Sequence, residues 1–440
     1  MTRRILAAAI ATQGPEGVID DAELSWGEDG VLDYVGPRRG PAAPGDLELP
    51  GQVLLPGLVN GHTHSAMTLL RGCSDDDGLA PWLDRVRALE LQMSHADVAA
   101  GLRLALVEML RSGTTLFADM YHWDAELLEI VRAAGLRVLA APAAFAADAV
   151  GFPGVDPRTG AEVLDLTEQL AERYAGDDQI RLAYGPHAPY TCPPEFLREI
   201  GDRAVRTGLP VHIHLSESAP EVRVNLDRYG RTPAMHVAEL GLLRARVLVA
   251  HGVHLTAEEI ALLAEHGAAV SHNPVSNLKL GSGIAPLPEL LAAGLDLALG
   301  TDSVASNNSL DLFEEIKTGA ILHRGVTQRA DAVRGADLLA LATSRGAAAV
   351  GFPETGALRA GMLADVIAVD ATGPHAVPMH AVASYLSFAA RGSDVRHVFV
   401  GGRHLLDDGR LTSLDEPAIL AAAARATERL RAAAAERPSG

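Results

Sequence analysis

The chain has 440 residues, of which 48% are hydrophobic, so it is long enough for a large domain with an appended module. Its formal net charge of −19 argues against nucleic acid or an anionic membrane surface as a partner, and no apolar run approaches the ~20 residues of a membrane-spanning helix. The two cysteines, Cys73 and Cys192, exclude a disulfide framework and favour a reducing cytoplasm.

The first 55 residues are expected to form the N-terminal part of a small β domain. Strands are predicted at Ile5–Thr12, Ala22–Trp26 and Val31–Val35, and the turn sequence Gly27–Gly30 joins the last two. Ile5–Thr12 resembles a secretory signal only faintly, because its apolar part is short and strands follow it. Residues 36–44, which are rich in proline and glycine, are expected to form a loop.

From residue 56 to residue 355, apolar strand candidates alternate with segments of helical length. The eight predicted strands are Gly57–His64, Thr115–Met120, Arg137–Phe145, Ile180–His187, Pro210–Glu217, Arg246–Val253, Ala268–Asn273 and Leu295–Asp302. The clearest helix is Asp97–Ser112, which Gly113 closes. This alternation indicates an α/β fold with parallel pairing, and eight units predict a closed (β/α)₈ TIM-like barrel. The chemistry of such a barrel lies at the C-terminal strand ends.

Strands without long helices between them return in residues 356–440. They are predicted at Ala364–Asp370, Val395–Val400 and Arg403–Leu406, and Gly401-Gly402 joins the last two as a hairpin. We expect this section to pair with residues 1–55 in a small β-sandwich domain built from both chain ends. A C-terminal helix is predicted to follow, with Ser413 and Glu416 as its capping box.

Histidines and a carboxylate lie at the C-terminal ends of three predicted barrel strands. His62 and His64 are one residue apart and therefore point to the same side of the first strand. His214, nearer the strand end than His212, follows on the fifth strand, and Asp302 ends the eighth. Three imidazoles and one carboxylate suit a single zinc-like divalent ion. A two-metal site would need a bridging anion such as a carboxylated lysine, and no lysine lies between His64 and His214.

Further polar residues at the strand ends are candidates for proton transfer and substrate binding. A cation would lower the pKa of water, and hydrolysis then needs one group to accept a proton and another to deliver one. Asp302 can accept the water proton, and Glu217, just beyond the fifth strand, can deliver a proton to the substrate. His251, at the sixth strand end, is placed to orient the nucleophile or polarise the substrate. His187 is either a substrate contact or a loop residue held between prolines.

Several stretches of the chain resemble the amidohydrolase superfamily, in its mononuclear deaminase branch. They look most like the 5′-methylthioadenosine/S-adenosylhomocysteine deaminases. The stretches that carry this resemblance are His62-Thr63-His64 with residues 67–72, Gly185–Tyr190, Ser271–Pro274, Ser276–Gly281, and Gly300-Thr301-Asp302 with residues 305–308. The resemblance covers nearly the whole chain.

The resemblance implies a role for each candidate residue. It implies that one zinc or iron ion per chain is bound by His62, His64, His214 and Asp302. It implies that Glu217 carries a proton to the purine ring nitrogen and that His251 polarises the water. Glu90, in the helix after Trp82, would hold the ribose hydroxyls, and Trp82 and His187 would be further substrate contacts.

Two departures from the family pattern are relevant. Asp302 is followed by Ser303-Val304 where Gly-Ala is common. The third strand ends in Ala141-Pro142-Ala143, where the resemblance calls for an arginine that meets the homocysteine carboxylate, and Arg158 in the next loop is a possible substitute. Without a fixed guanidinium, a nucleoside with a neutral 5′ group is favoured over S-adenosylhomocysteine.

The expected protein is a cytoplasmic, metal-dependent hydrolytic deaminase that converts a 6-aminopurine nucleoside to an inosine-type product and ammonia. Its partner is a small molecule, and the resemblance implies a homo-oligomer. Aminodeoxyfutalosine deaminase, free-base deaminase and s-triazine chlorohydrolase activities stay open, because all use hydroxide attack on an electron-poor ring carbon. Glu90 discriminates among them, since a free base has no ribose. A non-catalytic scaffold is disfavoured because all four ligands and Glu217 are present.

Overall fold

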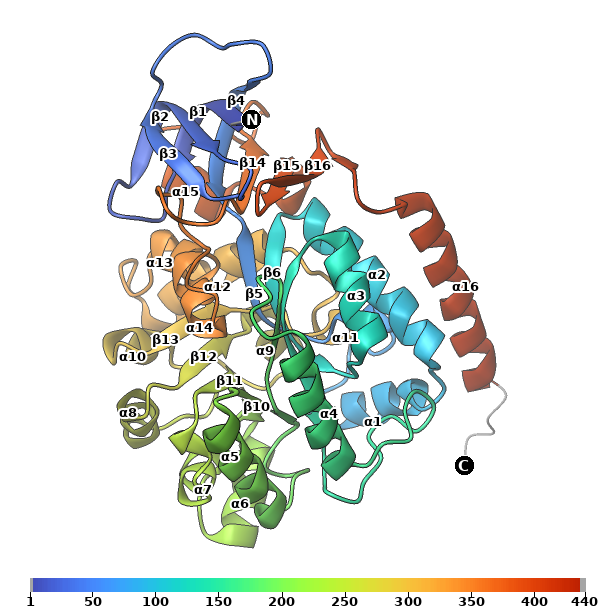
Figure 1. The fold of residues 1–440 in the computed structure, drawn as a ribbon. Coiled ribbons are helices and arrows are strands. Elements are labelled where there is room, and N and C mark those ends of the chain that lie inside the picture. Colours follow the sequence, from blue (N-terminus) through green and yellow to red (C-terminus); the bar gives the residue numbers. More distant parts are fainter. Residues whose placement is uncertain (1–2, 436–440) are drawn as a thin grey trace.

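The computed structural model describes residues 3–435, and its centre consists of two sheets of parallel strands (Figure 1). One sheet has the order β5-β6-β7-β8, with β9 paired to β7, and the other has the order β10-β11-β12-β13. Every pairing within them is parallel, as the alternation of strands and helices predicted. The strands are β5 (Leu58–Thr63), β6 (Thr114–Tyr121), β7 (Arg137–Ala144), β8 (Ile180–Leu182), β9 (Gly185–Pro186), β10 (Val211–Leu215), β11 (Val247–His251), β12 (Ala269–His272) and β13 (Asp296–Leu299).

The predicted fourth strand, Ile180–His187, is interrupted in the structure. β8 ends at Leu182, and only two residues of β9 pair with β7 beyond it. Pro186 has no N–H to continue a ladder. A Cβ added at Gly185 would lie 2.7 Å from the carbonyl oxygen of Pro142, so glycine permits the close approach of the two backbones.

Hydrogen bonds connect the two parallel sheets at both of their edges. At one edge, the His212 amide donates to the Tyr184 carbonyl (2.8 Å), and the Tyr184 amide donates to Pro210 (2.9 Å). At the other edge, the Asp302 amide donates to the His62 carbonyl (2.9 Å). The strand ends that carry the predicted metal ligands are therefore brought to one region of the molecule.

Helices fill the connections and lie outside the parallel strands (Figure 1). They are α1 (Leu79–Glu90), α2 (His95–Arg111), α3 (Ala125–Ala134), α4 (Gly160–Arg173), α5 (Pro194–Thr207), α6 (Ala219–Tyr229), α7 (Pro233–Glu239), α8 (Ala257–Glu265), α9 (Pro274–Lys279), α10 (Leu287–Ala292), α11 (Val304–Asn307), α12 (Leu312–Thr327), α13 (Gly335–Leu341) and α14 (Ser344–Val350), with 3₁₀ turns η1 (Ser65–Leu70) and η2 (Leu242–Arg244). The predicted helix over 97–112 is α2, which starts two residues earlier at a capping box of Ser94 and Asp97. Gly113, with φ +88°, follows its end.

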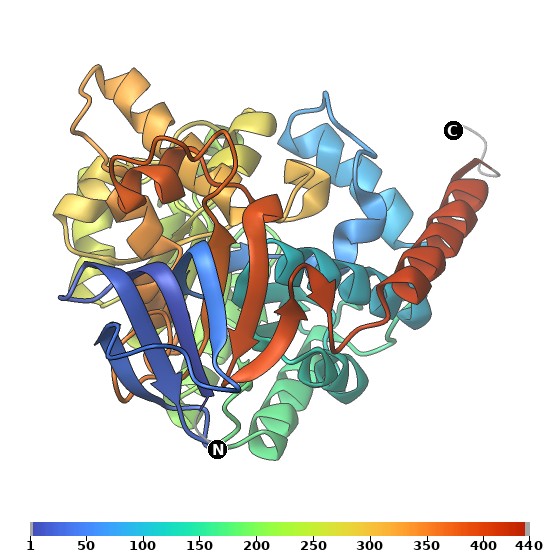
Figure 2. The same cartoon turned by 90° about the horizontal axis from the view of Figure 1, so that it is seen from above.

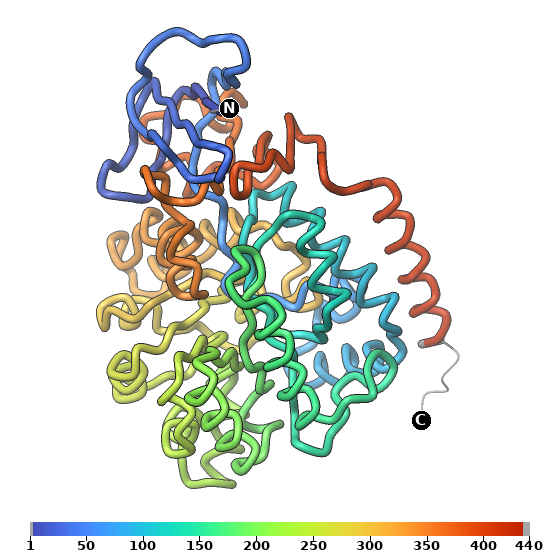
Figure 3. Tube along the Cα trace, in the orientation of Figure 1, coloured from blue at the N-terminus to red at the C-terminus, as the bar shows by residue number. Residues whose placement is uncertain are grey.

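Both ends of the chain contribute to one eight-stranded sheet, in the order β17-β16-β15-β14-β4-β1-β2-β3 (Figure 2). Its strands are β1 (Arg3–Ala11), β2 (Val18–Trp26), β3 (Leu32–Pro37), β4 (Leu47–Pro56), β14 (Val366–Asp370), β15 (Val395–Val400), β16 (Arg403–Asp407) and β17 (Arg410–Leu411). β1 and β4 are parallel, whereas the other neighbours are antiparallel. The predicted hairpins at Gly27–Gly30 and Gly401-Gly402 are present. β4 was not predicted, and it places β14 beside the N-terminal strands (Figure 3).

This sheet curls around a core of its own. Trp26 on β2 and Phe399 on β15 lie four positions apart in the strand order, yet their ring centroids are 5.3 Å apart in an edge-to-face contact. Ile5, Leu24 and Val366 belong to the same buried cluster. The larger core lies between the parallel strands and their surrounding helices.

A buried ion pair ties the small sheet to the parallel strands. Arg137, the first residue of β7, donates from Nε and Nη2 to the two carboxylate oxygens of Asp365 (2.7 and 2.9 Å). The side chains of both residues are 1% exposed. The same carboxylate accepts the backbone N–H of Gly401 in the β15–β16 turn (2.7 Å). The junction is therefore fixed by a fully paired buried charge.

The last elements are α15 (Val382–Phe388), η3 (Gly392–Asp394) and α16 (Glu416–Ala435), which runs along α2. The predicted capping box at α16 is wrong. Ser413 donates instead to the carbonyl of Ala134 (2.9 Å), and Glu416 pairs with Arg111 of α2. Asp415 accepts the backbone N–H of Ala418 (3.2 Å) in the first turn of the helix. Within the described part of the chain, no helix combines the length and apolar character needed to cross a membrane.

Candidate metal centre and adjoining cavity

The four predicted metal ligands converge at the C-terminal ends of β5, β10 and β13. Nε2 of His62 and Nε2 of His64 lie 3.4 and 3.3 Å from Oδ1 of Asp302. Nε2 of His214 lies 3.2 Å from Nε2 of His64. Such separations match the distance of about 3.3 Å between neighbouring ligand atoms around a tetrahedral zinc ion. Residues that are 240 positions apart in sequence thus form one compact set of donors.

The outer nitrogen of each imidazole is already occupied, which leaves the inner nitrogen for a metal. Nδ1 of His64 contacts a carbonyl at the end of β6, and Nδ1 of His214 lies 2.7 Å from the carbonyl of His187. Nδ1 of His62 lies 2.9 Å from Nε2 of His212. A ring that donates from Nδ1 presents the lone pair of Nε2. Nε2 of His62 is buried and has no hydrogen-bond partner among the described residues, so the site fits a divalent cation.

The charges of the cluster also suit a cation. Burial lowers the pKa of His62 to about 3 and lowers the pKa of His214 well below its usual value, which keeps both rings neutral. His64 is different: although burial disfavours its charged form, the hydrogen bond with Asp302 raises its pKa to about 9. A proton is thus drawn to the position that a metal ion would take.

Three residues at the strand ends have left-handed backbone conformations that non-glycine residues rarely adopt. The φ angles are +52° for Ser216, +75° for His251 and +59° for Asp302. Such conformations cost on the order of 1–3 kcal/mol each and concentrate at functional sites. Here they turn the chain sharply where each strand ends, so that His251 and Asp302 face the centre.

Glu217 and His251 lie beside the metal ligands. Nδ1 of His251 donates to Oδ1 of Asn277 (2.8 Å), and its Nε2 lies 4.0 Å from Oε1 of Glu217. Burial raises the pKa of Glu217. Glu221, which sequence reasoning missed, accepts the backbone amides of Ser216 and Glu217 (3.0 and 2.7 Å) and so fixes the turn after β10. The pattern Ser218-x-x-Glu221 at the start of α6 was an available signal.

A cavity of about 450 Å³ opens directly from this centre. Its wall includes all the predicted substrate contacts except Arg158, namely Trp82, Glu90 and His187. Arg158 does not line the cavity, because its Nη1 is paired with the Asp156 carboxylate (2.7 Å). The structure therefore does not bring Arg158 to the position that the resemblance suggested.

Glu90, at the end of α1, has a side chain that is 12% exposed and makes one firm hydrogen bond. It accepts the hydroxyl hydrogen of Tyr121 (2.7 Å), and burial raises its pKa. Nη1 of Arg87, one helical turn earlier, lies 3.6 Å from its second oxygen. Arg87 also donates to the carbonyl of Gly151 and lies 5.8 Å from the ring centroid of Phe152. Sequence reasoning did not identify this guanidinium as a cavity residue, and its i,i+3 spacing from Glu90 was the only signal.

Trp82 and His187 contribute apolar surface to the cavity. The indole N–H of Trp82 donates to the Ala305 carbonyl (3.0 Å), so its polar atom is satisfied within the protein. His187 stacks on Phe145 with ring centroids 5.0 Å apart, and burial lowers the pKa of His187 to about 3. Both side chains are held in place before any ligand binds.

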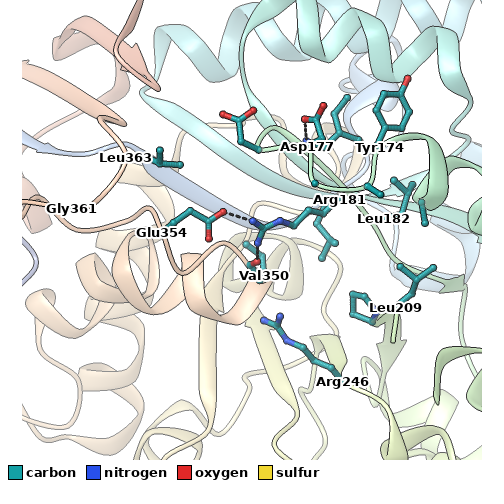
Figure 4. Close-up of a pocket in the computed structure, with 18 residues that line it drawn as sticks. Tyr174, Asp177, Arg181, Leu182, Leu209, Arg246, Val350, Glu354, Gly361 and Leu363 are labelled. Carbon is teal, nitrogen blue, oxygen red and sulfur yellow. Dashed lines mark hydrogen bonds and ion pairs between the residues drawn. The ribbon is translucent and has the colours of Figure 1, made fainter. Parts of the chain in front are cut away.

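A second cavity, of about 580 Å³, lies at the opposite, N-terminal ends of the strands (Figure 4). Arg181 projects into it and pairs with Glu354, and Arg246 donates to the carbonyls of Ala348 and Ala349 at the end of α14. Its lining residues include no histidine or cysteine. Two of its arginines contact carbonyls at the C-terminal end of α14, an arrangement that stabilises a helix end.

Comparisons with known proteins agree with this geometry. The chain is 43% identical to the 5-methylthioadenosine/S-adenosylhomocysteine deaminase of Syntrophobacter fumaroxidans, over 92% of this chain and 93% of that protein. It is 41% identical to the 5′-deoxyadenosine deaminase of Methanosarcina barkeri, over 93% and 95% of the two chains. A zinc-bound adenosine deaminase from Xanthomonas campestris superposes with a TM-score of 0.93 at 35% identity, covering 98% of both chains.

More distant structures share the fold alone. A zinc-bound atrazine chlorohydrolase from Arthrobacter aurescens superposes with a TM-score of 0.87 at 24% identity, covering 97% of this chain and 100% of the other. Residues 53–405 match the Amidohydrolase family, a span that contains every predicted metal ligand. By sequence and by fold, this chain belongs to the amidohydrolase family.

Proposed function

We propose that the protein is a metal-dependent hydrolytic deaminase that converts a 6-aminopurine nucleoside and water to an inosine-type nucleoside and ammonia. The observation that carries this proposal is a single cavity that joins a His/His/His/Asp centre to the carboxylate of Glu90, whose side chain is 12% exposed. A base at the centre and a ribose at Glu90 would fill such a space. The relatives named above act on adenosine derivatives by their names, which supports the same substrate class here.

The proposed cofactor is one divalent cation per chain, Zn²⁺ with Fe²⁺ as the alternative. It would be held by His62, His64, His214 and Asp302. When bound, the cation supplies a Lewis acid that makes water nucleophilic near neutral pH. The zinc-bound adenosine deaminase structure supports zinc as the first choice.

The proton transfers are assigned to two carboxylates on either side of the reacting carbon. Water adds to C6 of the purine while Asp302 accepts a water proton. Glu217 delivers a proton to the ring nitrogen, which gives a tetrahedral C6 that bears a hydroxyl and an amino group. Asp302 then passes its proton to the amino group, and the C6–N bond breaks. Ammonia leaves as the hydroxyl proton passes to Glu217 and the C6 carbonyl forms. His251, whose Nδ1–H is committed to Asn277, orients the attacking water through Nε2. The burial of Glu217, which raises its pKa, supports its role as a proton donor.

The far end of the cavity is assigned to the sugar and its 5′ substituent. Glu90 would accept hydrogen bonds from the ribose hydroxyls, with Trp82 and His187 as walls. Arg87 adds a cation beside Glu90, so an acidic 5′ group has a partner although the third strand lacks an arginine. We therefore include S-adenosylhomocysteine in the substrate class alongside nucleosides with neutral 5′ groups.

The architecture is inferred in the same way. Residues 56–355 would form a closed (β/α)₈ barrel, which the hydrogen bonds at both sheet edges support. Residues 1–55 and 356–440 would form the small β-sandwich domain, supported by the curled sheet and its separate core. We also infer a cytoplasmic homo-oligomer, from the two unpaired cysteines and from the family resemblance.

The test is ammonia release by the zinc-replete protein from a panel of substrates: adenosine, 5′-deoxyadenosine, methylthioadenosine, S-adenosylhomocysteine, aminodeoxyfutalosine, adenine and 8-oxoguanine. Turnover of the adenosine nucleosides with slow turnover of both free bases is expected. A zinc-replete protein that leaves every nucleoside unchanged would contradict the proposal. Activity on free bases alone would agree with the proposed metal centre but would overturn the assignment of Glu90 to the ribose.

A further inference from the structure

A second cluster of possible metal ligands lies outside the cavity, where three elements meet. His95 is the first residue of α2, His122 follows the end of β6, and Asp124 is the N-cap of α3. Nε2 of His95 lies 2.8 Å and Nε2 of His122 lies 3.6 Å from Oδ2 of Asp124. All three ligand atoms lie within 4.8 Å of one another. Figure 1 shows α2 and α3 side by side.

Hydrogen bonds within the described part of the protein do not satisfy both ring nitrogens of His122. Its residue is 7% exposed, and its Nε2 is buried without a hydrogen-bond partner among the described residues. Nδ1 faces the Asp156 carboxylate at 3.6 Å. A carboxylate behind one ring nitrogen and an open lone pair on the other is the arrangement of a metal-binding histidine. His62 has the same open inner nitrogen in the first centre.

We propose that His95, His122 and Asp124 bind a second divalent cation of the Zn²⁺ class, with water completing its coordination. Two imidazoles and a carboxylate are typical zinc ligands. The separations of 2.8 and 3.6 Å lie on either side of the distance of about 3.3 Å expected between neighbouring ligands of a tetrahedral zinc ion. In the structure His95 donates a hydrogen bond to Asp124, and the cation would replace that proton.

Asp124 can serve as a ligand without giving up its structural role. Its Oδ1 accepts the backbone N–H of Leu127 (2.9 Å) and so caps α3, which leaves Oδ2 for the cation. Nε2 of His95 and Nε2 of His122 both face this oxygen, at 2.8 and 3.6 Å.

A third cluster, of His397, His404 and Asp407 on the β15–β16 hairpin, serves as a comparison. Its ligand atoms are also close, with 3.2 Å between Nδ1 of His397 and Nε2 of His404. However, the backbone N–H of Asp408 donates to Nδ1 of His397 (3.3 Å) and occupies its lone pair. The cluster at His122 has no such competitor at Nε2 among the described residues.

A cation at His122 would stabilise the wall of the substrate cavity. His122 directly follows Tyr121, whose hydroxyl donates to Glu90. The ring of Phe152 lies 4.8 Å from Tyr121 and 6.2 Å from His122, between centroids. The ion would join the starts of α2 and α3 to the end of β6, and its role would be structural.

The test is the metal content of the full-length protein, loaded with zinc, freed of excess ion and measured by mass spectrometry. We expect two equivalents per chain in the wild type, one in His122→Gln and two in the control His404→Gln. One equivalent in the wild type that persists in His122→Gln would overturn the proposal. So would a second equivalent lost in His404→Gln and retained in His122→Gln.

A second variant guards against misfolding of the buried substitution. The His95 side chain is 30% exposed, so His95→Gln is compatible with the fold and should also remove one equivalent. Zinc added back to metal-free protein should raise the melting temperature in two steps for the wild type and in one step for His95→Gln. A His95→Gln protein that retains two equivalents would overturn the assignment.

Discussion

Glu217 is a buried carboxylate, and its Oε1 lies 4.0 Å from Nε2 of His251. The substitution Glu217→Gln keeps its shape but cannot deliver a proton to the purine ring. We expect kcat to fall by about 10²–10⁴-fold, the usual contribution of general acid–base catalysis. Ammonia release measures the loss, and the zinc content should not change because Glu217 is not a proposed ligand. Activity within tenfold of the wild type would contradict the assignment.

We predict that Arg87, which lines the cavity, selects for an acidic 5′ group on the substrate. Arg87→Met removes the guanidinium beside Glu90 while keeping an apolar stem. Because charge-assisted hydrogen bonds contribute about 1.5–3 kcal/mol, kcat/KM for S-adenosylhomocysteine should fall by at least about tenfold. The kcat/KM for methylthioadenosine, which has no acidic 5′ group, should change much less.

The matched control is Arg85→Met, on the same helix. Arg85 is 63% exposed in its side chain and pairs with Asp77, away from the cavity lining. The Arg85→Met variant should leave kcat/KM unchanged for both S-adenosylhomocysteine and methylthioadenosine. Equal losses for the two substrates in Arg87→Met would show that the residue supports the wall and does not select the 5′ group.

At the scale of elements, the link between β7 and the strand β14 depends on Arg137 and Asp365. Removing one partner of a buried pair leaves an uncompensated charge, which costs about 3–5 kcal/mol. Arg137→Met should therefore lower the free energy of unfolding by that amount, measured by chemical denaturation. The control Arg396→Met breaks an exposed pair with Asp408 and should cost less than about 1 kcal/mol. Similar costs for the two variants would contradict this account.

At the scale of the whole molecule, Glu315 is expected to make stability depend on pH. It lies on α12 and accepts hydrogen bonds from the backbone of Val275 (3.2 Å) and the side chain of Asn307. Burial raises its pKa from 4.5 to about 8. Between these values the native state keeps the proton and the unfolded state loses it, so stability falls as pH rises, by at most about 1.4 kcal/mol per pH unit.

Glu315→Gln removes this titration. The Glu315→Gln variant should therefore become more stable relative to the wild type as the pH rises from 5 to 8. Chemical denaturation of both metal-loaded proteins measures the difference in their free energies of unfolding. The neighbouring exposed Glu314→Gln is the control and should show no such trend. A difference between wild type and Glu315→Gln that is constant over this range would contradict the prediction.

The sequence by itself determined the parallel strands and brought out the four residues of the candidate metal centre. The C-terminal ends of parallel strands lie at the same edge, whatever the conformation of the loops between them. The four residues His62, His64, His214 and Asp302 could therefore be grouped from their places at the ends of the predicted strands. The local patterns also gave the order of most elements. β4 escaped prediction because Pro50 and Gly51 interrupt its apolar pattern, and its pairing with β1 and β14 is what makes it a strand.

Only the tertiary structure decided which residues line the cavity beside the candidate metal centre. Arg87 reaches the cavity because one face of α1 lines it, whereas Arg158, nearer in sequence to the expected position, is held by Asp156. Ser413 and Glu416 likewise do not pair with each other as a capping box. Ser413 bonds to Ala134 of α3, and Glu416 bonds to Arg111 of α2. The physical reason is the same in each case: a loop or helix-end side chain binds the nearest complementary group in space, and sequence separation does not reveal that neighbour.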